Sequence, residues 1–510
     1  MNLNNITQQY LELFPGNTSG NPQQRQTPGV LWCTLETAGF PNAKLLHFNQ
    51  KLSKKIGLNK IENQQDQDFL NSNVLNLPIK PYATAYAGHQ FGNWAGQLGD
   101  GRAIFAGEIS DFNGKKTELQ WKGAGATPYS RHADGRAVLR STVREYLMSE
   151  AMHHLGVSTT RALSISLSGE QVVRDIMYSG NAAPEKGAVM MRTAESFLRF
   201  GHFELASASK NIELLKELTD FTIKNYYPEI SGEGQEKYLG FFREVSGRTA
   251  DMVVDWFRVG FVHGVMNTDN MSILGQTIDY GPYAMLEEYD LSFTPNTTDL
   301  PGRRYAFGEQ GKIAQWNLWQ LANALFPLIN DADALQDILN QFGDVFWKKH
   351  DEMLCGKFGL DALLPDDSSF FTDWQQMMTD LELDHTLFFQ KLEVFETLTL
   401  NDLAEISYLP VKDELFFKNF LDAYAKRLNI NKINREESLL LMKKNNPKFI
   451  LRNYLLFECI EDLDSGNTAY FEKLWTALQD PYTVLFPEFN QKRPSKYNGV
   501  AGCSMLSCSS

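Results

Sequence analysis

His263-Gly264-Val265-Met266-Asn267-Thr268-Asp269-Asn270, followed by Asp279-Tyr280-Gly281, is the stretch that decides the fold expected for this chain. The side chains of Asn270 and Asp279 carry oxygen atoms, which are the ligands that Mg²⁺ prefers in proteins. The carboxylate of Asp269 can accept a proton, whereas the apolar Val265 cannot. These are the residue types that a metal-dependent site with Asp269 as its base would need.

The order of these residues resembles the catalytic loop of a protein kinase. In the kinase pattern His-Arg-Asp-x-x-x-x-Asn, the Asp takes the proton of the substrate hydroxyl, and the Asn and a later Asp-Phe-Gly hold metal ions. Val265 stands where the kinase has its proton acceptor, while Asn270 and Asp279 keep the two metal positions. Asp269 is the substitute base under this comparison. A helix-capping or loop-ordering role is the structural alternative for Asp269.

A glycine-rich run, Gly92-Asn93-Trp94-Ala95-Gly96-Gln97-Leu98-Gly99-Asp100-Gly101-Arg102, precedes a predicted hairpin. Closely spaced glycines let backbone N–H groups approach phosphate oxygens. The run matches neither the Walker A nor the Rossmann pattern, so a turn that closes a hairpin is an equal alternative. Strands are predicted over 103–109 and 118–122, joined at Asn113-Gly114.

Lys122 ends the second of these strands, where a kinase places the lysine that contacts the nucleotide phosphates. Apolar residues four apart predict a helix over 136–155, which carries Glu145 where the ion-pair partner of that lysine would be. Glu150 competes with Glu145, because five residues turn a helix by about 500° and the two cannot enter the same cleft. A solvated strand lysine is the structural alternative for Lys122.

The remaining patterns predict an α+β, two-lobed protein-kinase-like fold. The predicted core is 80–310, with a β-rich N-lobe over about 80–195 and a helical C-lobe over about 196–310. Residues 1–79 are expected to form a helical or irregular extension packed on the core, and 311–510 a helical extension with a flexible tail containing Cys503 and Cys508. Further strands are predicted at 162–165, 171–173 and 188–192, and helices at 212–225, 247–266, 315–326, 333–342 and 415–428.

Composition restricts the classes of function. The 510 residues are 43% hydrophobic and 12% aromatic, which is enough to bury a large core. The formal charge of −14 argues against a general binder of nucleic acids or anionic membranes. No segment has the ~18 apolar residues of a membrane span, and residues 1–13 lack the pattern of a signal or transit peptide. We therefore expect a soluble, cytoplasmic protein, and the sequence carries no prediction of oligomeric state.

Three longer strings resemble the selenoprotein O family and cover, with shorter ones, most of residues 80–310. They are Tyr86-Ala87-Gly88-His89-Gln90-Phe91-Gly92 with its continuation to Arg102, Lys122-Gly123-Ala124-Gly125 with its continuation to Arg131, and Asp134-Gly135-Arg136-Ala137-Val138-Leu139-Arg140-Ser141. Arg192-Thr193-Ala194, the 263–270 stretch and Asp279-Tyr280-Gly281-Pro282 continue the match.

This resemblance implies a pseudokinase that binds ATP in reversed orientation and transfers AMP to Ser, Thr or Tyr hydroxyl groups of proteins, with Mg²⁺, or Mn²⁺ in its place, as the metal. It implies Asp269 as proton acceptor, and Asn270 and Asp279 as metal ligands. The residues implied in nucleotide binding are Gly99, Gly101, Arg102, Lys122, Asp134, Gly135, Glu145, Arg192, Arg199 and Asp279. The four cations in this set are Arg102, Lys122, Arg192 and Arg199. They suit a pyrophosphate leaving group, since guanidinium forks pair with phosphate oxygens. Surface ion pairing is the alternative for each of them.

The resemblance also implies a redox role for Cys508, which lies third from the end, where some relatives carry selenocysteine. Some relatives have a cysteine partner after the Asp-x-Gly, but this chain reads Phe293-Thr294-Pro295-Asn296 there. A Cys503 to Cys508 bond, an intermolecular bond and a free thiol stay open. Two other functions also stay open: a kinase that transfers the γ-phosphoryl group, and a non-catalytic nucleotide-binding scaffold.

Overall fold

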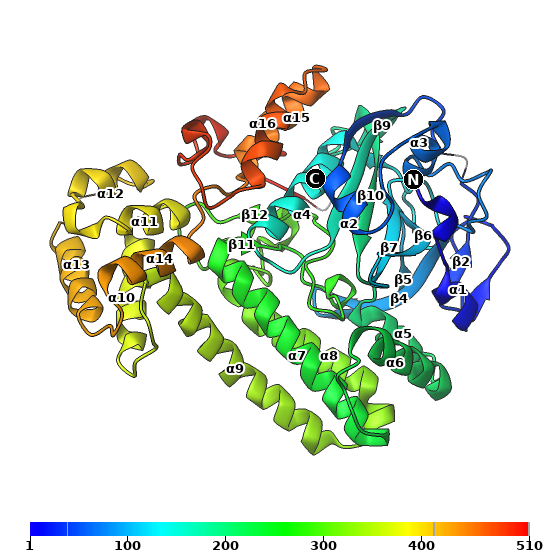
Figure 1. The fold of residues 1–510 in the computed structure, drawn as a ribbon, viewed down its shortest axis with the longest axis horizontal. Coiled ribbons are helices and arrows are strands. Elements are labelled where there is room, and N and C mark those ends of the chain that lie inside the picture. Colours follow the sequence, from blue (N-terminus) through cyan, green and yellow to red (C-terminus); the bar gives the residue numbers. More distant parts are fainter. Residues whose placement is uncertain (38, 412–413, 508–510) are drawn as a thin grey trace.

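A ten-stranded sheet forms the centre of the N-terminal half of the protein, in a computed structural model that describes residues 1–37, 39–411 and 414–507 (Figure 1). The strands are β1 (Gly16–Asn17), β2 (Trp32–Thr34), β3 (Lys44–Phe48), β4 (Tyr82–Gln90), β5 (Asn93–Gly99), β6 (Ala103–Ser110), β7 (Lys116–Lys122), β8 (Ala137–Val138), β9 (Arg161–Arg174) and β10 (Ala183–Ala194). Their order is β1-β2-β4-β6-β7-β10-β9-β3, with β5 paired to β4 and β8 paired to β10. The β1–β2 pair is parallel and the other pairs are antiparallel.

Strand β7 shows how the sheet divides the N-terminal half into two sides. Alternate residues of a strand point to opposite faces. Leu119 and Trp121 are fully buried against the N-terminal segment, where the Trp121 Nε1 donates to the Phe69 carbonyl at 2.7 Å. Gln120 and Lys122 point to the other face, where they contact Arg192 and Glu145. The hairpin predicted from Asn113-Gly114 thus places one polar row of the site.

The N-terminal segment is bound into the sheet more closely than the sequence predicts. It contains α1 (Gln9–Leu13), α2 (Gln50–Lys55) and α3 (Gln64–Leu70), and its apolar side chains cover one sheet face. The prediction of a helical or irregular extension is wrong for three short stretches, because β1, β2 and β3 are members of the sheet. Each of these strands has only two to five residues, so the local sequence gives little sign of it, and its pairing with distant strands defines it.

Helices cover the opposite face of the sheet and form the rest of the molecule (Figure 1). The core helices are α4 (Leu139–His154), α5 (Phe200–Ala208), α6 (Ile212–Tyr226) and α7 (Gly234–Val259). The C-terminal helices are α8 (Gln310–Ile329), α9 (Ala332–Phe358), α10 (Asp367–Asp380), α11 (His385–Leu392), α12 (Leu400–Ile406), α13 (Glu414–Leu428), α14 (Arg435–Asn445), α15 (Asn453–Asp464) and α16 (Ala469–Leu478). A two-stranded ladder, β11 (Phe261–Val262) with β12 (Ala284–Met285), brackets the loop that carries Asp269 and Asp279.

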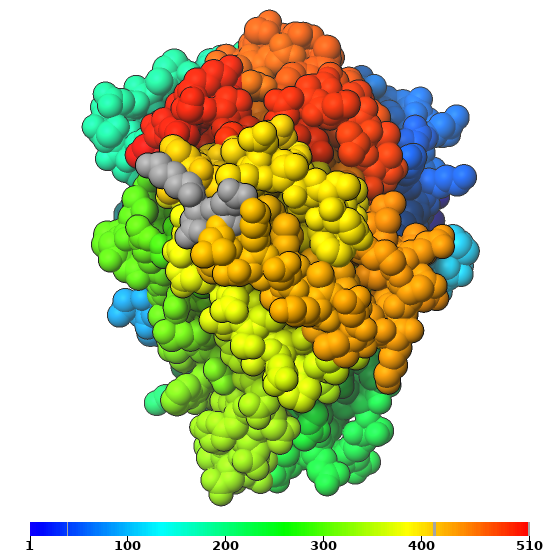
Figure 2. Space-filling model, turned by 90° about the vertical axis from the view of Figure 1, so that its left-hand side faces the viewer, coloured from blue at the N-terminus to red at the C-terminus, as the bar shows by residue number. Residues whose placement is uncertain are grey.

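Helices α10 to α14 form the end of the molecule away from the sheet, coloured yellow to orange in Figure 2. Helices α15 and α16 instead lie beside α4 and the sheet, where Trp475 contacts His47 and Tyr146. A buried ion pair helps to hold this region together, since Arg452 donates to both carboxylate oxygens of Asp384 at 2.8 and 2.9 Å. Arg493 in turn pairs with Glu287, which follows β12. The expected helical character beyond residue 310 is confirmed. Among the described residues, no helix is both long and apolar enough to cross a membrane.

Three details of the sequence prediction are wrong. The helix expected over 247–266 begins at Gly234 and ends at Val259, because Gly260 adopts a left-handed conformation (φ 76°) that stops it. The strands expected at 162–165 and 171–173 are one continuous strand, β9. The C-terminal tail is packed as far as it is described: Leu506 is fully buried, and its carbonyl accepts from the Thr297 N–H at 2.8 Å. Cys508 lies outside the described residues.

Candidate active site

A cavity of about 670 Å³ lies between the sheet, the start of α4 and the 265–282 loop. We call it the active-site cavity. Of the twelve residues singled out from the sequence, eleven line it: Gly99, Gly101, Arg102, Lys122, Asp134, Gly135, Arg192, Arg199, Asp269, Asn270 and Asp279. The twelfth, Glu145, lies behind this wall and contacts Lys122. The chain thus brings together residues up to 180 positions apart (Gly99 to Asp279) in one cavity.

Three cations converge on the carboxylate of Asp279. Arg192 donates to Asp279 Oδ1 at 2.6 Å, the Lys122 ammonium lies 3.3 Å from the same oxygen, and Arg199 donates to Asp279 Oδ2. Both arginines are buried, and their side chains are 2% exposed. Since buried charges are costly unless paired, surface ion pairing does not describe these residues. They form a positively charged inner wall whose shared partner is one carboxylate.

The charge state of Asp279 follows from this arrangement. Burial alone would raise the pKa of the Asp279 carboxyl, but Arg199, Arg192 and Lys122 hold its pKa well below the usual value. Asp279 therefore stays ionised. Its backbone lies in the left-handed region (φ 60°), which is uncommon for a residue with a side chain and directs the carboxylate into the cation cluster.

Lys122 and Glu145 form the ion pair that the sequence pattern predicts. Glu145 bridges two cations, since its Oε2 pairs with Lys122 and its Oε1 accepts from Arg192 at 2.9 Å. Glu150 turns elsewhere and pairs with Arg161, with both contacts at 2.7 Å. The two glutamates point to different sides of α4, so Glu145 rather than Glu150 is the ion-pair partner of Lys122.

Asp269 has the environment of a general base. Its side chain is buried beside the cation cluster, and its Oδ2 accepts a hydrogen bond from Gln90 Nε2 at 3.1 Å. Its Oδ1 is buried and has no hydrogen-bond partner within the described structure. Burial raises the pKa of Asp269 to about 6, against the opposing effects of the Gln90 hydrogen bond and the Arg199 charge. A carboxylate with a pKa near neutrality and one free oxygen suits proton acceptance.

The glycine-rich run serves two functions in the structure. Its first half belongs to the β4–β5 hairpin, whose tip contacts the 267–269 loop: the Phe91 N–H donates to Asn267 Oδ1 at 3.1 Å. Gly88 permits this approach, because a Cβ there would lie 2.9 Å from Asp269 Oδ1. The hairpin alternative is therefore correct for residues 93–99. Only the end of the run, Gly99 to Arg102, lines the active-site cavity.

The outer part of the cavity contains Asp134 and Gly135. Asp134 forms a bidentate pair with Arg174 at 2.7 and 2.9 Å, and it accepts from the Arg136 N–H at 2.9 Å. Gly135 has φ 68°, and a Cβ there would come within 2.0 Å of the Gly125 carbonyl oxygen. Only glycine fits this turn. The pair of residues shapes the outer wall of the cavity.

Asn270 and Asp279 are candidate metal ligands on the floor of the cavity. Asn270 Nδ2 donates to the Val265 carbonyl at 3.0 Å, and this bond fixes the orientation of its side-chain amide. No group of three or more His, Cys, Asp or Glu side chains within the described ranges could hold a metal alone. Mg²⁺ at nucleotide sites usually takes one or two protein ligands and completes its shell with phosphate oxygens and water. The residues present fit that mode of binding.

Sequence reasoning missed three residues of this site. Asp100 is buried, lies 3.8 Å from Arg199, and accepts from both the N–H and the hydroxyl of Thr84. Tyr86 places its ring 4.9 Å under the Arg199 guanidinium. Gln90 holds Asp269. The position of Asp100 between Gly99 and Gly101 could have marked it as a site residue. Nothing local marks Gln90 as a partner of a residue 179 positions away.

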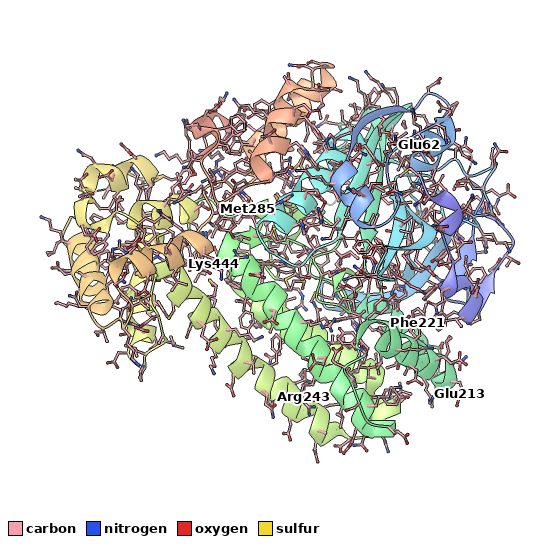
Figure 3. All side chains as sticks on the ribbon, viewed as in Figure 1. Glu62, Glu213, Phe221, Arg243, Met285 and Lys444 are labelled. Atoms are coloured by element: carbon pink, nitrogen blue, oxygen red, sulfur yellow. The ribbon has the colours of Figure 1, made fainter. Side chains whose placement is uncertain are left out.

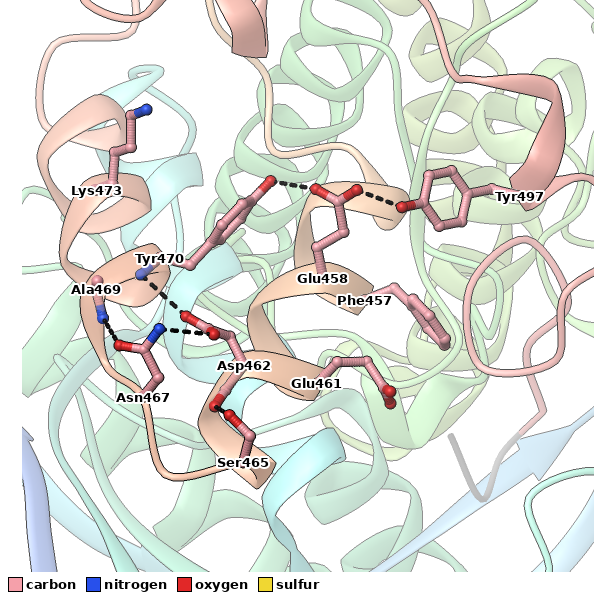
Figure 4. Close-up of a pocket in the computed structure, with 10 residues that line it drawn as sticks. All are labelled: Phe457, Glu458, Glu461, Asp462, Ser465, Asn467, Ala469, Tyr470, Lys473 and Tyr497. Carbon is pink, nitrogen blue, oxygen red and sulfur yellow. Dashed lines mark hydrogen bonds between the residues drawn. The ribbon is translucent and has the colours of Figure 1, made fainter.

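A second hollow, of about 700 Å³, lies among α15, α16 and the 497 region (Figure 4). Three carboxylates, those of Glu458, Glu461 and Asp462, line it. Tyr470 and Tyr497 both donate to Glu458. Its lining has one cation, Lys473, which is paired with Glu488. An acidic wall repels phosphates, so chemistry rather than size makes the active-site cavity the better candidate for binding phosphate groups.

Comparisons with known proteins find relatives over nearly the whole chain. The family model of the protein adenylyltransferase SelO matches residues 18–479. The chain is 49% identical to a protein nucleotidyltransferase YdiU from Cytophaga hutchinsonii, over 99% of this chain and 98% of the relative. It is 46% identical to a YdiU from Flavobacterium johnsoniae, over 99% of both chains, and 44% identical to one from Azoarcus sp., over 98% of both.

Proposed function

The chain belongs to the protein adenylyltransferase SelO family, and we propose that it transfers AMP from ATP to Ser, Thr or Tyr hydroxyl groups of other proteins, releasing pyrophosphate. The observation that carries this proposal is the convergence of Lys122, Arg192 and Arg199 on the inner wall of the active-site cavity. ATP is the substrate that the family name implies.

We further propose a two-lobed, protein-kinase-like arrangement of this α+β chain. The N-lobe would comprise about 80–195 and the C-lobe about 196–310, with residues 1–79 and 311–510 as extensions. The order of sheet, Lys122, α4 with Glu145, and the loop between β11 and β12 supports this division. The packing of β1, β2 and β3 into the sheet makes the first extension an integral part of the N-lobe.

Pyrophosphate is a highly charged leaving group, and its negative charge accounts for the cations of the inner wall. Attack at the α-phosphorus forms a bond to the acceptor oxygen and breaks the bond to the β-phosphate oxygen. Negative charge then grows on the β and γ phosphates, where arginine forks and a lysine stabilise it. We infer that the inner cations exchange Asp279 for these phosphates when ATP binds, and that Arg102 contacts the same groups from nearer the opening.

Asp269 is the base in this proposal. Its unpartnered Oδ1 accepts the proton of the acceptor hydroxyl as that oxygen attacks phosphorus. Gln90 fixes the other oxygen, so the carboxylate cannot rotate freely. Asn270 and Asp279 would hold Mg²⁺, which when bound supplies charge neutralisation for the phosphates. Val265, at the usual position of a kinase base, leaves that place apolar.

Parallel incubations with α-labelled and γ-labelled ATP test the proposal. An acceptor protein should gain the α label and not the γ label, because AMP transfer retains only the α-phosphorus. Asp269→Ala should abolish the transfer while ATP binding persists. Transfer of the γ label would support a kinase, and ATP binding without any transfer would support a non-catalytic scaffold; either result would contradict the proposal.

A further inference from the structure

A smaller hollow adjoins the active-site cavity on the side of β5, with a volume of about 490 Å³. We call it the β5 hollow. It shares Tyr129 and Arg131 with the active-site cavity, so the two spaces meet at these residues. The lining of the β5 hollow is Gln24, Arg25, Gln26, Gln90, Ala95, Gln97, Leu98, Pro128, Tyr129 and Arg131.

The β5 hollow is positively charged within an acidic protein. Two arginines line it and no carboxylate does, although the whole chain carries a formal charge of −14. Arg25 donates to the carbonyls of Asn21 and Gln23 at 2.7 and 2.9 Å, and Arg131 donates to Gln90 Oε1 at 3.3 Å. Among the described residues, no Asp or Glu forms an ion pair with either arginine. Both charges are thus available to an anionic partner.

The hollow is connected to the base through one side chain. Gln90 accepts from Arg131 with its carbonyl oxygen and donates to Asp269 Oδ2 with its amide nitrogen. A group that occupies the β5 hollow therefore lies one residue away from the carboxylate proposed to deprotonate the acceptor. This position suits a segment of the acceptor protein whose hydroxyl enters the active-site cavity from the β5 side.

The strand beside the hollow has an open edge. In the part of the chain that the structure describes, β5 pairs only with β4, and residues 93–95 are exposed. An open edge presents N–H and C=O groups that an extended peptide can pair with. Side-chain amides of Gln24 and Gln26 add further donors and acceptors of the kind that bind peptide groups, whereas both ends of the Gln97 amide bond to Thr27.

We propose that the β5 hollow binds an extended, acidic segment of the acceptor protein, next to the hydroxyl that receives AMP. This inference rests on the proposed function for the identity of the partner. Charge complementarity selects acidic residues near the acceptor hydroxyl, and the β5 edge selects an extended backbone. Only two cations are present, so a nucleic-acid backbone, which needs a longer basic track, fits less well.

Peptide binding tests the inference without requiring catalysis. The probe is a fluorescent nine-residue peptide with a central Ser flanked on each side by two Glu residues, and the matched probe carries Lys in place of Glu. The Glu peptide should bind the full chain roughly fivefold or more tighter than the Lys peptide, and the difference should shrink at high salt. Equal binding of the two peptides would overturn the inference.

Variants locate the preference. Arg25→Glu should remove or reverse the preference for the Glu peptide, because Arg25 lines the β5 hollow but not the active-site cavity. Its affinity for ATP should equal that of the unaltered protein. Arg243→Glu, an exposed site on α7 (Figure 3), makes the same charge change far from β5 in sequence and should keep the preference. Loss of preference in Arg243→Glu, or its retention in Arg25→Glu, would contradict the assignment.

The two proposals can fail separately. If the Glu peptide binds as expected and Arg25→Glu abolishes the preference, the interface stands even when labelled ATP yields no AMP transfer. If AMP transfer to proteins occurs but the Glu and Lys peptides bind alike, the proposed function stands and the interface is wrong.

Discussion

Replacing Asp279 by Asn should expose how much the inner wall depends on one negative charge. The substitution keeps the shape of the side chain and removes the partner shared by Lys122, Arg192 and Arg199. Breaking a buried ion pair by removing one partner costs about 3–5 kcal/mol. Lys122 and Arg192 would still have the Glu145 carboxylate, whereas the nearest carboxylate to Arg199 would be that of Asp100 at 3.8 Å. We therefore expect about 3 kcal/mol, the lower end of the range.

Thermal unfolding measures this effect. A loss of about 3 kcal/mol should lower the unfolding temperature by about 3 °C, because the entropy of unfolding of 510 residues is large. Pyrophosphate added with a metal chelator should restore much of the loss, because its oxygens replace the missing carboxylate. The matched control is Asp337→Asn, which removes a charge from an exposed position on α9 and should change little.

The pH dependence of stability tests the contribution of the Asp279 charge independently. The folded-state pKa of Asp279 is depressed, so its stabilising contribution is present above the unfolded-state pKa of about 3.9 and is lost as the pH falls below it. The gap between the unaltered protein and Asp279→Asn should persist from pH 5 to 8, roughly, and narrow below about pH 4. An Asp279→Asn protein as stable as the unaltered one at pH 7, with no added response to pyrophosphate, would refute this account of the inner wall.

Three further outcomes follow from single contacts. The rate of AMP transfer at saturating ATP should rise as the pH increases through about 6, because burial raises the pKa of Asp269 to that value and the base must be ionised; a flat profile would argue against Asp269 as base. In titrations with ATP, Glu145→Gln should weaken binding, whereas Glu150→Gln should lower the unfolding temperature through Arg161 and leave ATP affinity unchanged. Steady-state kinetics of Gly88→Ala should show a reduced turnover with ATP affinity retained, since the new Cβ would press on Asp269 Oδ1 at 2.9 Å; unchanged turnover would show that the contact is unimportant.

Local patterns predicted the parts of the fold that are set by local chemistry. The Asn113-Gly114 turn gave the β6–β7 hairpin, and the four-residue apolar spacing gave α4 with Glu145 on it. The three short strands β1, β2 and β3 escaped prediction, because strands of two to five residues depend on hydrogen bonds to distant partners. The start of α7 was missed as well, since its polar first turns resemble a loop until they pack on neighbouring helices.

The site was predictable in its residue types and less so in its contacts. The order of Lys122, Glu145, Asn270 and Asp279 along the chain was sufficient to predict that these four residues lie in or beside one cavity. Arg192 and Arg199 were found by resemblance, because no spacing links β10 and the start of α5 to the loop at Asp279. The contact between Gln90 and Asp269 joins two loops 179 residues apart and required the structure.

The mass of the adduct on an acceptor protein tests the central claim most directly. Tandem mass spectrometry after incubation with ATP and Mg²⁺ should find AMP attached to a Ser, Thr or Tyr oxygen, with pyrophosphate released in equal amount. The Asp269→Ala protein should yield no adduct although it still binds ATP. A phosphate adduct, or an AMP adduct formed equally well by Asp269→Ala, would contradict the account.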